Sequence, residues 1–221
     1  MNRLNLTIGL LLVLTTLSCT RGKLTEISLN CGCVVTEHYI ASTDDIENST
    51  KKYTFKNSQL FDFGVSKDGF ANSFSLQICN MIGESEKYNL IEIDIVKEKD
   101  GEIQSTKTYT YEVEKVKAEL PKYLKLESFV AQYVTNIYNK DYSACLEFID
   151  IKDKEKFKTV IDNVYEGLNK DYRETRIADY KSDGKNYSIF GIIKSQSDKL
   201  DLFTMKLKEV DNEYEIISFN F

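Results

Sequence analysis

The C-terminal part of the chain carries the pattern that most restricts its fold. Four segments alternate apolar and polar residues, as strands with one buried face do. These segments are residues 172–180, 186–194, 200–210 and 213–221. Asp183-Gly184 and Asp211-Asn212 lie between segments and are turn signals. Because strands joined by hairpin-length links pair with their neighbours, the sequence predicts a four-stranded antiparallel meander.

Three helical patterns precede the meander. Residues 126–137 place apolar side chains at i, i+3, i+4 and i+7, which predicts an amphipathic helix. A short helix follows, with Asp141 as its N-cap, and a third covers 157–168 with Asp150 as its cap. We expect one face of the meander to pack against these helices. Candidate residues for that face are Ile189, Phe203, Met205, Ile217 and Phe219.

Residues 34–118 form a separate pattern that predicts a small α+β domain. Residues 52–65 alternate like one or two short strands, and Phe70 to Met81 follow helical spacing up to Gly83. A hairpin is predicted next, with strands at 89–96 and 105–113 around an Asp100-Gly101 turn. Pro121 is the only proline and lies where the strand pattern gives way to a helical one, so we place the domain boundary there.

The helical region has a recognisable local sequence. ESFVAQYVTNIYNKDYSACLEFID, residues 127–150, resembles the opening of small bacterial members of the NTF2-like, or cystatin-like, superfamily. The residues that carry the resemblance are Phe129, Tyr133, Tyr138, Asp141, Tyr142 and Leu146. It implies an α+β cone over residues 122–221, with three helices and then the four-stranded meander. Members of that superfamily include isomerases, dehydratases, transport factors and non-catalytic domains, so the resemblance implies a fold and leaves function open.

The N-terminus predicts export and a lipid anchor. Arg3 precedes an apolar run that is too short to span a bilayer, the layout of a signal peptide. The run ends in TLSC, residues 16–19, which resembles the lipobox of bacterial lipoproteins. That resemblance implies removal of residues 1–18, lipidation of Cys19, and a tether over residues 19–33. Because residue 20 is not Asp, the resemblance favours attachment to the outer membrane of the bacterial cell envelope. An ordinary secreted protein is the alternative.

Four cysteines remain after Cys19, namely Cys31, Cys33, Cys79 and Cys145. Exported proteins permit disulfides, so we interpret them as staples between the tether and the first domain, with Cys31 and Cys33 paired to Cys79 or to each other. A metal or redox role for Cys31 and Cys33 is the alternative. Losing Arg3 with the leader changes the net charge from −6 to −7, which argues against a nucleic-acid partner.

No set of residues in the sequence specifies a catalytic site, a metal site or a cofactor. The single histidine, His38, lies upstream of the predicted cone, and Asp44, Asp45 and Glu47 have the character of a solvated loop. Tyr133, Tyr138 and Tyr187 are candidate hydrogen-bond donors within the cone, but no acid stands out as their partner base. We therefore expect a lipid-anchored, non-catalytic protein that binds a small apolar molecule or a partner protein. An isomerase or dehydratase type of enzyme and a redox or metal-handling protein are the alternatives.

Overall fold

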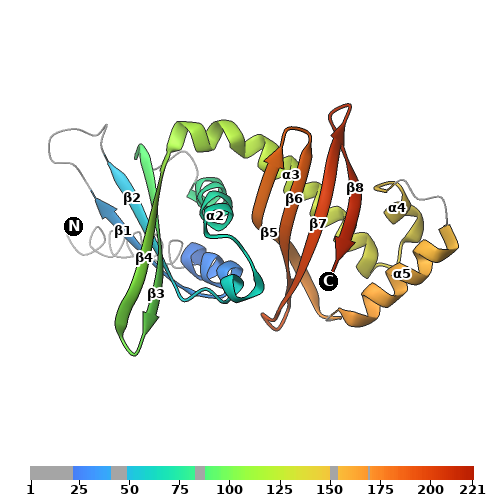
Figure 1. Ribbon diagram of the computed structural model, residues 1–221, viewed down its shortest axis with the longest axis horizontal. Helices are drawn as coiled ribbons and strands as arrows, with labels where there is room; N and C mark the ends of the chain where they lie inside the picture. Colours follow the sequence, from blue (N-terminus) through green and yellow to red (C-terminus); the bar gives the residue numbers. More distant parts are fainter. Residues whose placement is uncertain (1–21, 41–48, 83–87, 150–153, 169) are drawn as a thin grey trace, which may run out of the picture.

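The computed structural model describes residues 22–40, 49–82, 88–149, 154–168 and 170–221. It is a mixed α+β structure with two four-stranded sheets, and one long helix runs from the first sheet past the second (Figure 1). No described helix is long and apolar enough to cross a membrane. The predicted leader, Cys19, the acidic loop 44–47, Gly83 and Asp150 lie outside the described residues.

The first sheet has the order β1-β2-β3-β4. Its strands are β1 (Val34–Ile40), β2 (Thr50–Lys56), β3 (Leu90–Lys99) and β4 (Glu102–Glu112). Strands β2 and β3 are parallel because α2 (Lys67–Ile82) connects them, whereas the other two pairs are antiparallel. The predicted helix and hairpin are thus confirmed. The second strand considered within 52–65 is instead a 3₁₀ helix, Gln59–Phe63.

Helix α2 is buried on almost every side and lies between the two sheets. Toward the first sheet, the Phe70 and Phe74 rings each lie 5.2 Å from the ring of Phe55. Toward the second, Asp179 of β5 accepts hydrogen bonds from the backbone N–H and the hydroxyl of Ser66, which precedes the first turn of α2. Gly69 is required there, because a Cβ on it would lie 1.6 Å from an Asp179 carboxylate oxygen.

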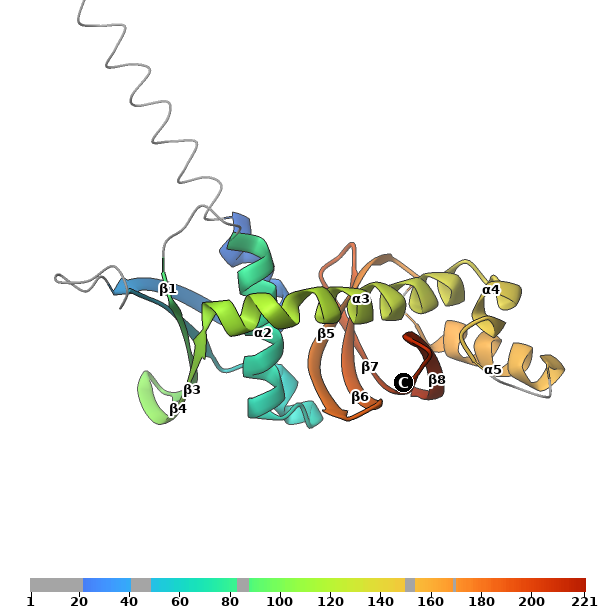
Figure 2. The ribbon, with the colours of Figure 1, turned by 90° about the horizontal axis from the view of Figure 1, so that it is seen from above.

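The long helix α3 (Val113–Tyr138) begins earlier than the sequence predicted and contains Pro121. Val113, Val116 and Tyr123 are all buried, so the apolar stripe extends back through the proline. This burial outweighs the hydrogen bond that a proline removes from a helix interior. Figure 2 shows α3 passing over α2 and then along the second sheet.

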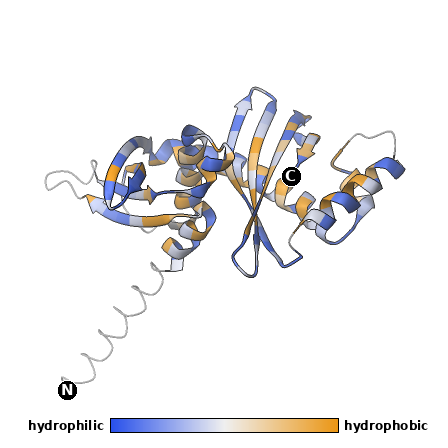
Figure 3. Ribbon diagram, turned by 60° about the horizontal axis from the view of Figure 1, so that its bottom comes forward, coloured by the Kyte–Doolittle hydropathy of each residue, from blue (hydrophilic) through white to orange (hydrophobic). Residues whose placement is uncertain are grey.

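The second sheet is an antiparallel meander with the order β5-β6-β7-β8, as the alternation predicted. Its strands are β5 (Tyr172–Asp183), β6 (Asn186–Ser195), β7 (Leu200–Val210) and β8 (Glu213–Asn220). Colouring by hydropathy shows apolar and polar residues mixed along these strands (Figure 3). Before the sheet come α4 (Tyr142–Leu146) and α5 (Lys154–Gly167), and Asp141 caps α4 by accepting a hydrogen bond from the Ala144 N–H.

The prediction was wrong for one residue that it assigned to the buried face of the meander. Ile217 is 54% exposed, although Ile189, Phe203 and Met205 are buried as expected. The register between β7 and β8 shifts at Lys206/Leu207, so Leu207 pairs with Ile216 and Lys206 with Ser218. Ile217 is the extra residue of this bulge, and simple alternation cannot reveal a bulge.

The segment expected as a tether is structured in the part described. Residues 22–31 are helical, and Ile27, Asn30 and Cys31 are buried. Gly32 is in the left-handed region and turns the chain into β1. The segment looked unpatterned because its buried face includes an amide and a cysteine as well as apolar side chains.

Candidate functional site

The most apolar of the cavities lies at the far end of α3, where α3, α5 and β8 meet. Its volume is about 300 Å³. Side chains from these three elements form its walls, among them Tyr133, Phe157, Val160, Ile161, Val164 and Phe219. We call it the α5 cleft. Val160 is 47% exposed, so the cleft has an apolar rim as well as an apolar interior.

Tyr133 supplies the polar group of the α5 cleft. The residue is 1% exposed, and its ring contacts those of Phe148 and Phe219 at 5.7 and 5.3 Å. No described residue hydrogen-bonds to its hydroxyl, although buried tyrosines normally satisfy that group. Burial raises the pKa of Tyr133, so the hydroxyl stays neutral and can donate.

Behind the cleft, aromatic rings fill the space between α3 and the second sheet. Phe129 contacts Phe148 and Tyr214 at 5.0 and 5.4 Å, and Tyr214 contacts Tyr187 at 5.3 Å. Phe203 fits over Gly191, where a Cβ would lie 1.9 Å from the ring. Aromatic packing therefore closes this part of the space between α3 and the second sheet.

The three tyrosines proposed as donors from the sequence are not brought together. The Tyr187 hydroxyl donates to Glu209 at 2.7 Å, and Tyr138 stacks on Tyr172 with ring centroids 4.5 Å apart. Tyr133 alone of the three lines the α5 cleft.

A different polar cluster lies between the two sheets, and most of it was not predicted from the sequence. Lys194 of β6 is fully buried, and its Nζ lies 2.8 Å from both Glu174 Oε1 and Asn30 Oδ1. Asn30 donates to Gln77 at 3.1 Å, and Gln77 donates to the Ile177 carbonyl at 3.0 Å. We call this network the charged seam. It connects the 22–31 helix and α2 to β5 and β6.

Helix α3 contributes a further acid to the seam, and Glu26 of the 22–31 helix contributes another, 3.3 Å from Arg176 Nη2. Glu127 is 8% exposed; it accepts a hydrogen bond from Tyr123 at 3.1 Å and from Arg176 at 3.4 Å. Burial raises the pKa of Glu127 against the opposing effects of these two partners. The position of Glu127 within the apolar stripe of α3 was the one feature of the sequence that could have indicated a buried acid. Glu127 lines none of the four cavities described for this structure.

The pKa of Glu174 is shifted in the opposite direction from that of Glu127. Burial by itself would raise the pKa of Glu174, but the hydrogen bond from Lys194 and the charge of Arg176 lower it below its ordinary value. Arg176 Nη2 lies 2.8 Å from Glu174, so the two cations share this carboxylate. The seam is thus an assembly of paired groups, as buried charges require.

Cys31 and Cys33 form a disulfide with each other, whereas Cys79 and Cys145 are buried free thiols. Of the two pairings considered from the sequence, the structure has the local one. Burial raises the pKa of Cys145 to about 12 and also raises that of Cys79, so neither is poised as a thiolate. His38 is exposed on β1, and no group of three or more metal-binding side chains gathers within the described ranges.

Comparison with known proteins adds one likeness. No family model and no curated protein matches the chain. A solved structure from Campylobacter jejuni, provisionally assigned as an NTF2-like transpeptidase, is similar with a TM-score of 0.36 and 13% identity. The similarity covers 41% of this chain and 94% of that chain. At this level the likeness concerns the fold of part of the chain and carries no argument about activity.

Proposed function

We propose that this protein is a non-catalytic binding protein of the bacterial cell envelope, and that the α5 cleft holds a small apolar molecule with one hydrogen-bonding group. The observation that carries the proposal is the Tyr133 hydroxyl, to which no described residue hydrogen-bonds, in an otherwise apolar cavity. Ligand sites are typically apolar cavities of this size with a few placed polar groups.

The chemistry of the cleft favours an apolar ligand over a polar one. Each methylene that a ligand buries there contributes about 0.8 kcal/mol. A charged ligand would lose its hydration and find no buried counter-charge, since Lys156 is exposed and the remaining walls are apolar or aromatic. The Tyr133 hydroxyl would orient the ligand by one hydrogen bond.

The packed interior argues for binding rather than catalysis. An isomerase-type site needs a base that a substrate can reach. Glu127, the buried acid on α3, is paired with Arg176 and Tyr123 and lies away from the cleft. In our proposal, residues 122–221 form the NTF2-like cone that the sequence resembles, with its interior filled and residues 34–118 as a separate small domain.

A lipid on Cys19 would hold the protein at the membrane, with the outer membrane favoured. Two or three acyl chains make such attachment stable, whereas one is marginal. Cys19→Ala should move the protein from the membrane fraction to the soluble fraction and abolish incorporation of labelled palmitate. Retention of the variant in membranes, together with an unlabelled wild type, would refute the anchor.

The binding proposal is tested by blocking the α5 cleft. Val160→Trp places an indole at the rim, whereas Thr159→Trp, on the same helix but outside the lining, is the matched control. We expect organic extracts of purified wild type and Thr159→Trp to contain the same small molecule by mass spectrometry, and Val160→Trp to lack it. Equal content in all three proteins, or no bound molecule in any of them, would contradict the proposal.

A further inference from the structure

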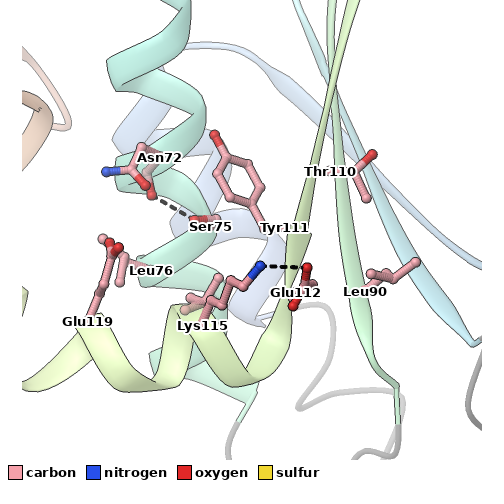
Figure 4. A pocket seen from close by; sticks show the side chains of 10 residues that line it. Asn72, Ser75, Leu76, Leu90, Thr110, Tyr111, Glu112, Lys115 and Glu119 are labelled. Carbon is pink, nitrogen blue, oxygen red and sulfur yellow. Dashed lines mark hydrogen bonds and ion pairs between the residues drawn. The ribbon is translucent and has the colours of Figure 1, made fainter.

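A second cavity lies at the opposite end of α3 and shares no lining residue with the α5 cleft. It is a groove of about 340 Å³ between α2, the end of β4 and the first turns of α3 (Figure 4). Its polar side chains are Asn72, Ser75, Tyr111, Glu112, Lys115 and Glu119. The function proposed above does not use this groove.

The floor of the groove carries Lys115 and, one turn further along α3, Glu119, and a second acid, Glu112, lines the same groove. Lys115 and Glu119 are four residues apart on α3, so their Cβ atoms are about 6 Å apart on one helix face. Figure 4 shows both side chains extending from α3 into the space in front of α2. Glu119 is exposed and makes no ion pair within the described part of the chain.

The ammonium of Lys115 is available to a ligand at little cost. It pairs with Glu112 at 2.7 Å, and both side chains are more than half exposed. Exposed pairs of this kind contribute only about 0–1 kcal/mol, so a ligand carboxylate can replace Glu112. Glu112 is also the N-cap residue of α3 and gives no side-chain cap. The positive end of the helix dipole therefore reinforces an anion site at Lys115.

The walls offer a neutral hydrogen-bonding group between these two charges. Tyr111 is half-buried, and among the described residues nothing hydrogen-bonds to its hydroxyl. The Ser75 hydroxyl donates to the Asn72 backbone carbonyl at 2.7 Å, and Ser75 is fully buried, so it is not open to a ligand. The Tyr111 hydroxyl can donate to the carbonyl of an amide.

We infer that this groove binds a small zwitterion, an amino acid or short peptide with free termini, with its carboxylate at Lys115 and its ammonium at Glu119. Tyr111 would contact an amide between the two termini. A simple anion at Lys115 would leave Glu119 unmatched, whereas a zwitterion matches both groups. The site is independent of the α5 cleft, so either can fail without the other.

Calorimetric titration of the full chain with alanyl-alanine tests the inference. We expect saturable binding that weakens about 10-fold or more when the peptide is N-acetylated or when its carboxylate is amidated. Putrescine, a dication, and acetate, a monoanion, serve as controls that carry charge of one sign only and should not compete. Absence of alanyl-alanine binding, or equal binding of the N-acetylated peptide, would overturn the site; tighter binding of putrescine would show a cation site instead.

Matched variants connect binding to the floor residues. Glu119→Gln should weaken alanyl-alanine about 10-fold or more but leave the weak binding of the N-acetylated peptide unchanged, because that peptide has no ammonium. Glu114→Gln, on the same helix and 89% exposed, should bind like wild type. Both sites are exposed, so both variants should fold. Equal effects of the two substitutions would refute the assignment of Glu119.

Discussion

Two buried tyrosines on α3 stand in opposite situations and show what the two halves of the helix do. Tyr123, in the charged seam, donates its hydroxyl to Glu127 and lies 3.4 Å from the Ile177 carbonyl. Tyr133, ten residues later, lines the apolar α5 cleft, and no described residue hydrogen-bonds to its hydroxyl. The first arrangement fixes α3 against β5 of the second sheet. In our proposal the second serves a ligand, so stability and binding are separated along a single helix.

The largest effect should come from removing the acid that neutralises the buried lysine. Glu174→Leu leaves Lys194 with Asn30 alone, in a site where its Nζ has no access to water. Removing one partner of a buried pair costs about 3–5 kcal/mol, because the other charge stays desolvated. We expect urea unfolding to show a loss in this range.

The matched control for that variant is an acid in an exposed pair. Glu166 lies 3.7 Å from Lys170 and is 69% exposed, so Glu166→Leu should change the free energy of unfolding by less than about 1 kcal/mol. Similar losses for the two variants would mean that the seam does not stabilise the packing of the 22–31 helix and α2 on β5 and β6.

A smaller loss is expected where α2 meets β5. Gly69→Ala would place a methyl group against the Asp179 carboxylate and separate it from the start of α2. Overpacking of this kind costs about 1–3 kcal/mol. Gly167→Ala, at the end of α5 with nothing within 4 Å, should be neutral or slightly stabilising. Thermal unfolding of the two variants distinguishes them, and equal melting temperatures would refute the close contact.

Removing the hydroxyl of Tyr123 should lower the free energy of unfolding by about one hydrogen bond more than removing that of Tyr133. Tyr123→Phe removes one donor to Glu127, leaves Arg176 as its side-chain partner, and should lower the free energy of unfolding by about 1 kcal/mol. Tyr133→Phe removes a hydroxyl that no described residue uses and should change the stability of the ligand-free protein by less than about 0.5 kcal/mol. Urea titrations of both variants, after solvent extraction, make the comparison.

The pH dependence of stability should distinguish Glu174 from Glu127, because their pKa values are shifted in opposite directions. The lowered pKa of Glu174 means that its stabilisation is present above about pH 4.5 and disappears as the pH falls through its folded value. The raised pKa of Glu127 has the opposite sign, since its ionisation destabilises the native state as the pH rises above about 4.5. The deficit of Glu174→Gln should therefore shrink on acidification, whereas Glu127→Gln should gain relative stability as the pH rises. Parallel trends in urea unfolding would contradict this.

Local patterns in the sequence predicted most of the individual elements. Alternation located all four strands of the second sheet, helical spacing located α2, and Asp141 was correctly placed as an N-cap. These features depend on a residue and its near neighbours. The bulge at Ile217 and the continuation of α3 through Pro121 depend on partners distant in the sequence, and the local pattern was wrong about both.

The candidate sites were harder to predict for the same reason. Lys194 appears in the sequence as an ordinary strand lysine, and only the fold brings Glu174 and Asn30 to it. Tyr133 was one of three candidate donors named from the sequence, but its difference from Tyr187 lies in Glu209, which reaches the Tyr187 hydroxyl from another strand. Single-residue patterns identify candidate donors, whereas their satisfaction is a property of the packed structure.

The most direct test of the separation along α3 is the amount of small molecule that copurifies with Tyr133→Phe compared with Tyr123→Phe. Native mass spectrometry before and after denaturation measures that occupancy for each protein. Our account predicts that Tyr123→Phe retains wild-type occupancy while Tyr133→Phe loses most of it, since one hydrogen bond is worth up to about 10-fold in affinity. Full occupancy in Tyr133→Phe, or loss in Tyr123→Phe alone, would contradict the account.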